Sequence, residues 1–149
     1  MSIQAIRWVF EKPILDAMAA LSPAVPVLLD NSAIVENDAL TEYAVLRIDF
    51  GRVTEDALQI PLERMRGSIV FGAYTEKNKG PGRNQVVCTE ALRALNNIGV
   101  CGGRPKCGAW GRTMNMSGPS FFSLDDRPYF FGSLNCGFDS QWRDPADCS

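Results

Sequence analysis

Residues 64–98 decide the fold, and they read RMRGSIVFGAY (64–74), TEKNKGPGR (75–83) and NQVVCTEALRALNNI (84–98). The first run is rich in β-branched and aromatic residues, which predicts a strand. The second run is polar and typical of a loop. The third run has the apolar spacing of one helical stripe, formed by Val87, Ala91, Ala94, Leu95 and Ile98. We therefore expect a strand, a loop, and a helix that packs onto the sheet and ends at a Gly99 cap.

A first amphipathic helix is expected over Ser2 to Leu21. Its inward stripe would be Ile3, Ile6, Phe10, Ile14, Ala17, Met18 and Leu21. Its outward side chains would be Gln4, Arg7, Glu11 and Asp16. Pro13 removes one backbone donor and clashes one turn back, so we expect a kink or a restart there.

Further strands are expected at Val27–Leu29, Tyr43–Phe50, Ala57–Leu62, Gly111–Met116 and Tyr129–Phe138, with Ser117–Pro119 breaking the fourth. In Tyr43–Phe50, apolar and polar side chains alternate, which predicts one face on a core and one face on water or a partner. Strands that follow one another with one helix between them predict an α+β fold. We expect a mainly antiparallel β-sheet with two α-helices packed on one face.

The length of 149 residues suits one domain, which we assign to residues 1–139, with residues 140–149 as a polar C-terminal tail. The net charge of −2 argues against a dedicated nucleic-acid binder, because phosphate neutralisation needs a basic face. No apolar run approaches the roughly 20 residues of a membrane-spanning helix. Charged residues near the N-terminus do not fit a signal-peptide core, so we expect a cytoplasmic protein.

No constellation of catalytic or metal-binding residues is evident, and the chain has no histidine, the commonest general base. The 75–83 loop superficially resembles a phosphate-binding loop but lacks the Gly-Lys-Ser/Thr ending, and Pro81 removes a backbone donor. The cysteines are Cys88, Cys101, Cys107, Cys136 and Cys148. Their spacing does not suit a zinc site, and unpaired thiols are the favoured interpretation over a Cys101–Cys107 disulfide. We expect neither enzymatic activity nor a cofactor or metal.

The whole layout resembles the phage tail terminator-like proteins of long-tailed bacterial viruses. The resemblance rests on MSIQAIR (1–7), ALSPAVP (20–26), YAVLRI (43–48), RGSIVF (66–71), MSGP (116–119) and residues 129–138. It covers roughly residues 1–139. The Cys- and Gly-rich insert Cys101–Trp110 and the C-terminal tail have no counterpart in it.

The resemblance implies a structural virion protein that forms a ring, commonly a hexamer. Such a ring caps the tail tube, stops its polymerisation and joins the tail to the head connector, while DNA passes through without being read. The protein would lie at the head-proximal end of the tail, and in the host cytoplasm during assembly. The alternatives are another neck component, such as a head-closure or tail-adaptor protein, or a small cysteine-based metal-binding module.

Five charged residues are the candidates for subunit or tail contacts. Arg47 and Asp49 lie on the polar face of a strand, where opposite charges can set the register with a neighbouring subunit. Lys77, Lys79 and Arg83 lie on the Gly-rich loop, which could reach across a subunit boundary. A closed ring needs a heterologous interface, in which one patch meets a different patch on the next copy.

Overall fold

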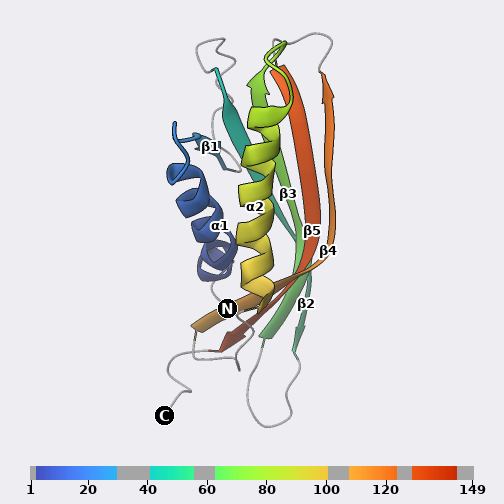
Figure 1. Cartoon of the computed structure of the whole chain (residues 1–149). Coiled ribbons are helices and arrows are strands. Elements are labelled where there is room, and N and C mark those ends of the chain that lie inside the picture. The colour runs from blue at the N-terminus through green and yellow to red at the C-terminus, as the bar shows by residue number, and fades with distance from the viewer. Residues whose placement is uncertain (1–2, 30–40, 56–62, 101–107, 124–128, 144–149) are drawn as a thin grey trace.

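Two helices lie side by side on one face of a five-stranded sheet (Figure 1). The computed structural model describes residues 3–29, 41–55, 63–100, 108–123 and 129–143. The elements in chain order are α1 (Ile3–Ala19), β1 (Val27–Leu28), β2 (Tyr43–Glu55), β3 (Glu63–Glu76), α2 (Gly82–Val100), β4 (Gly108–Ser123) and β5 (Tyr129–Arg143). This arrangement confirms the predicted α+β class.

The strand order in the sheet is β1-β2-β3-β5-β4. Only the short β1 pairs in parallel, with Ala44 and Val45 of β2, and every other pairing is antiparallel. The central strands β3 and β5 pair along the whole length of β3. The predicted strand at Ala57–Leu62 lies wholly outside the described part of the chain.

The stretch that decides the fold forms the predicted strand, turn and helix, with shifted boundaries. The strand continues to Glu76 and the helix begins at Gly82, so the connection is shorter than the predicted 75–83 loop. Asn78 and Gly80 have φ angles of 66° and 79° in this turn, a region that Asn and Gly tolerate best. The helix continues to Val100, so Gly99 lies inside it and does not end it. Helix ends are weakly marked in sequence.

Helix α1 departs from its predicted pattern in three places. It continues through Pro13 without the restart that was one of the two predicted outcomes, because the packed apolar stripe outweighs one lost backbone hydrogen bond. Ile3 was predicted to face inward but is 51% exposed at the helix start. Glu11 was predicted to face outward but is buried, where its carboxylate accepts a hydrogen bond from Arg7 at 3.2 Å. A buried carboxylate is stable there because it has this charged partner.

The core lies between the two helices and the sheet. Six residues expected there are all buried: Leu46, Ile48, Ile69, Phe71, Leu95 and Leu134. Phe10 of α1 reaches Phe138 of β5, with ring centroids 4.7 Å apart, so the first helix contacts the sheet directly. The packing of both apolar stripes on one sheet face leaves the other face without helices.

The last two strands are longer than predicted. Strand β4 passes through Ser117–Pro119, and the predicted break is absorbed as shifts in register against β5. Strand β5 continues to Arg143, beyond the tail boundary placed after Asp139. Polar residues 139–141 belong to this strand because neighbouring strands on both sides satisfy its backbone.

Candidate functional site

The sheet face opposite the helices is here called the helix-free face. It carries exposed charged side chains. Side chains alternate along each strand, so residues next to core residues point to this face. Arg47 and Asp49 of β2 lie on it, with side chains 68% and 61% exposed. The nearest approach of their charged groups is 3.8 Å, so they form a loose, exposed ion pair within one strand. Such a pair contributes little stability and leaves both charges accessible.

An arginine cluster, Arg64, Arg66 and Arg112, surrounds the buried carboxylate of Asp139 on this face. Arg64 donates two hydrogen bonds of 3.2 Å, from Nε and Nη2, to the two Asp139 oxygens. Arg66 Nε and Arg112 Nη2 approach those oxygens only to 3.9 and 3.6 Å. The Asp139 side chain is 1% exposed, whereas those of Arg66 and Arg112 are about half exposed or more. Among the described residues, one carboxylate thus faces three guanidinium groups.

The register explains how strands far apart in sequence build this cluster. Asp139 of β5 pairs with Arg66 of β3 on one side and with Arg112 of β4 on the other. Sequence reasoning missed the cluster because its members come from three strands, whose register only the tertiary structure sets. The only local signal is the Arg-x-Arg pattern at 64–66, which places both arginines on one face of a strand.

An aromatic cluster occupies the other end of the helix-free face. The Tyr43 and Tyr74 rings are stacked with centroids 4.6 Å apart, and Tyr129 meets Tyr43 edge-on at 5.4 Å. Phe131 connects Tyr74 to Phe122, whose side chain is 48% exposed. Tyr43 was predicted on a polar face but is buried by its ring neighbours. The face is therefore apolar at one end and charged at the other.

Of the three predicted loop cations, Arg83 has a structural role. It lies in the first turn of α2, where Nε and Nη2 donate to the Glu42 carboxylate at 3.0 and 2.7 Å. Nη2 also donates to the Pro23 carbonyl at 2.6 Å. The hydrogen bond to Glu42 raises the pKa of the Arg83 guanidinium above its usual value. Arg83 therefore ties α2 to the segments before β2, while Lys79 is exposed in the turn and Lys77 is half-buried.

A buried polar network anchors the start of α2 to the sheet. Asn84 Nδ2 lies 3.0 Å from the Ala73 carbonyl, 3.1 Å from Thr75 Oγ1 and 3.1 Å from the Phe130 carbonyl. The Cys88 thiol donates to Asn84 Oδ1 at 3.4 Å. Both ends of the amide are thus engaged, as a fully buried amide requires. Sequence reasoning gave Asn84 no role, because its partners on β3 and β5 are set only by the tertiary fold.

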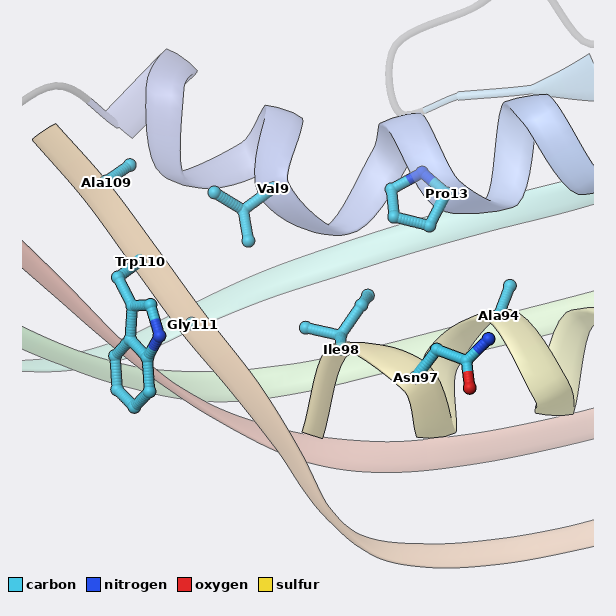
Figure 2. A pocket seen from close by; sticks show the side chains of 8 residues that line it. All are labelled: Val9, Pro13, Ala94, Asn97, Ile98, Ala109, Trp110 and Gly111. Atoms are coloured by element: carbon cyan, nitrogen blue, oxygen red, sulfur yellow. The ribbon is translucent and has the colours of Figure 1, made fainter. Parts of the chain in front are cut away.

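An apolar pocket of about 330 Å³ lies where α1, α2 and the start of β4 meet (Figure 2). Its lining residues are Val9, Pro13, Ala94, Asn97, Ile98, Ala109, Trp110 and Gly111. None of these described lining residues has an ionisable side chain that could act as a general acid or base. The Trp110 indole N–H is buried and has no hydrogen-bond partner.

Cys88 and Cys136 are buried free thiols on α2 and β5. Burial raises the pKa of each thiol from 9.0 to about 11. Because the thiolate is the reactive and metal-binding form, these two cysteines are poor nucleophiles and poor ligands. Among the described residues, no three His, Cys, Asp or Glu side chains gather as a metal site. The remaining three cysteines lie outside the described residues.

These raised pKa values predict that the folded state loses stability in alkali. The thiols ionise near pH 9 in the unfolded chain and near pH 11 in the folded protein. Above pH 9 the unfolded state therefore releases thiol protons first, and the free energy of unfolding falls as the pH rises. The loss should reach roughly 1 kcal/mol per thiol by about pH 10. Urea unfolding near pH 8 and pH 10 measures it. The Cys88→Ala variant should show a smaller loss between these pH values than the parent protein. An equal loss in both would contradict the assignment.

No helix among the described residues combines the length and apolarity needed to cross a membrane. The fold and the helix-free face define the class of protein: an α+β domain with helices on one side and an open, charged sheet surface on the other. No family model matches the sequence, and no curated protein matches it either.

Twenty-two chains of solved structures are similar to this chain. One of them has a TM-score of 0.69 and 23% sequence identity, and the match covers 95% of this chain and 97% of that chain. Its name states no activity, ligand or partner. This similarity shows the fold alone, and it extends over nearly the whole length of both chains.

Proposed function

We propose that this protein is a ring-forming tail terminator of a long-tailed bacteriophage. In this role, identical copies cap the tail tube, stop its polymerisation and join it to the head connector. The sequence resemblance described above motivates the family. The single structural observation that carries the proposal is the helix-free face, a sheet surface that neither described helix covers.

The composition of that face suits assembly better than catalysis. It combines exposed apolar side chains, Val70 and Phe122, with the charged pair Arg47 and Asp49. Arginine and aromatic residues are enriched among the energetically dominant residues of protein interfaces. The described residues that line the pocket between the helices carry no ionisable side chain.

The charged turn before α2 is a second contact candidate in this proposal. Lys77 and Lys79 lie in the turn after β3, at the end of that strand opposite the arginine cluster. Arg83 is not grouped with them, because its hydrogen bonds to Glu42 and Pro23 hold the fold together. A charge reversal at Arg83 would disturb folding as well as assembly.

The proposed partners are other copies of this chain, the tail tube protein and the head connector. DNA passes through the ring without specific contacts, in keeping with the chain's net charge of −2. Another neck component, a head-closure or tail-adaptor protein, is the alternative of the same class. A cysteine-based metal module is the alternative of a different class, and zinc bound stoichiometrically to the purified protein would favour it.

The test is made in the virus that encodes this protein. Particles assembled without the gene product should have overlong tails, or tails that do not join heads, as seen by electron microscopy. Complementation with the Lys77→Glu/Lys79→Glu variant should leave the defect, because reversed charge disrupts docking, while the purified variant keeps its thermal unfolding temperature.

The matched control is Lys12→Glu, on the outer surface of α1, where Lys12 forms an exposed ion pair with Asp16. This variant should restore normal tails. Normal infectious particles in the absence of the gene product would refute the proposal. Normal tails combined with heads that lose DNA would instead assign the protein to head closure.

A further inference from the structure

At one end of the sheet, β2 and β4 each have an edge without a partner among the described strands. On β2, pairing with β1 ends at Val45, and the described residues record no outer partner for Asp49–Glu55. Strand β4 pairs only with β5, so its outer side has no partner among the described strands. Unpaired strand edges of this kind are templates for another strand.

The register places these two open edges level with one another. Arg52 of β2 pairs with Arg66, Arg66 with Asp139, and Asp139 with Arg112 of β4. Three successive antiparallel pairings separate β2 from β4, so these outer strands run in opposite directions. A second copy in the same orientation, placed beside the first, would therefore continue the sheet with an antiparallel ladder.

On the helix-free face, the β2 edge carries Arg47 and Asp49, paired within the strand at 3.8 Å, and the β4 edge carries Arg112. Asp49 on the β2 edge and Arg112 on the β4 edge both lie on the helix-free face, with side chains 61% and 49% exposed. Asp139 holds Arg112 only at 3.6 Å, which leaves donors of its guanidinium available. Charged residues on open edges usually prevent uncontrolled pairing. Here a contact between unlike edges can pair Arg112 of one copy with Asp49 of a second copy.

We propose that residues 108–112 of β4 in one copy pair with residues 49–54 of β2 in a second copy, with Arg112 beside Asp49 of that copy. The level alignment would place Arg112 beside Arg52, and the proposed pairing is displaced from it by three residues of β2, or two register positions because of the irregularity between Phe50 and Arg52. A closed sheet of tilted strands requires such a stagger. The contact is heterologous, because each copy offers β4 to one neighbour and β2 to the other.

This inference rests on the proposed ring and names the surfaces by which its subunits meet. It is tested by charge exchange, with association followed by sedimentation equilibrium up to about 1 mM protein, where weak contacts become populated. Arg112→Asp and Asp49→Arg should each weaken self-association by about tenfold or more. The double variant should recover most of the loss, because the ion pair is restored with its charges exchanged.

The matched control is Arg93→Asp, the same substitution at an exposed arginine on α2, away from the sheet. It should leave association unchanged. Hydrogen exchange supplies a readout of the backbone ladder itself. In the parent protein, the amides of residues 49–54 and 108–112 should exchange more slowly when the protein is concentrated. In the Arg112→Asp variant, the same amides should not slow.

Three results would overturn the inference: association that neither charge reversal weakens, protection gained only outside these two edges, or a wild-type protein that stays monomeric to the highest concentration. None of these results decides the proposed function. The proposed function is tested by tail morphology in the virus. Failure of the subunit contact can therefore be told apart from failure of the proposed function.

Discussion

Replacing Leu95 with alanine should lower the free energy of unfolding by about 2–5 kcal/mol. Leu95 is fully buried on the face of α2 that packs on the sheet. Removing its isobutyl group loses the transfer free energy of that group and leaves a cavity that surrounding strands cannot fill completely. Urea unfolding monitored by tryptophan fluorescence or circular dichroism measures the loss.

The matched control is Val86→Ala on the same helix, where the Val86 side chain is 47% exposed. Its effect should stay within about 1 kcal/mol, because little apolar area is removed and alanine favours the helix. Equal losses in the two variants would contradict the docking of α2 described here. The comparison therefore tests the orientation of the helix and not only its presence.

Replacing Asn84 with alanine should destabilise the protein by about 2–4 kcal/mol, although the side chain is polar and small. The substitution leaves the Ala73 carbonyl, Thr75 Oγ1 and the Phe130 carbonyl without their buried amide donor. It also removes the acceptor of the Cys88 thiol. A buried polar group that loses its partner costs more than an average hydrogen bond contributes.

Asn96→Ala is the control for this prediction, since Asn96 is an exposed asparagine on the same helix. Its unfolding free energy should change by no more than about 0.5 kcal/mol. Asn84→Ala should in addition increase hydrogen exchange at the start of α2, because the network fixes that turn to β3 and β5. Unchanged exchange there would show that other contacts hold the helix start.

Hydrogen bonds at both ends of α2 explain why this helix matters for the proposed assembly. Asn84 fixes one end of the helix to β3 and β5, and Thr113 Oγ1 of β4 donates to the Leu95 carbonyl at 2.7 Å near the other end. Strands β3, β4 and β5 also carry the arginine cluster on the opposite face. A helix fixed at both ends keeps these strands in register, so the charged surface is held in one geometry.

Periodicity and the alternation of apolar residues determined the layered architecture from the sequence. The stripe through Val87, Ala91 and Leu95 predicted the face of α2 that is buried, and the alternation in Tyr43–Phe50 predicted an open sheet face. These features are local in sequence, because 3.6 residues per helical turn and two per strand repeat fix which side chains share a face. The ends of the elements were predicted less well, because α2 continues past Gly99 and β5 continues past Asp139.

Only the tertiary structure decided which polar residues have buried partners. Glu11, Arg83, Asn84 and Asp139 all belong to polar residue types that usually face water. Asp139 is buried because β3 and β4 bring arginines to it from 75 and 27 residues away in the chain. Arg83 is held by Glu42, 41 residues earlier. Residue type and spacing fix the faces of an element, whereas the burial of a charge depends on partners that strand order and register bring within reach.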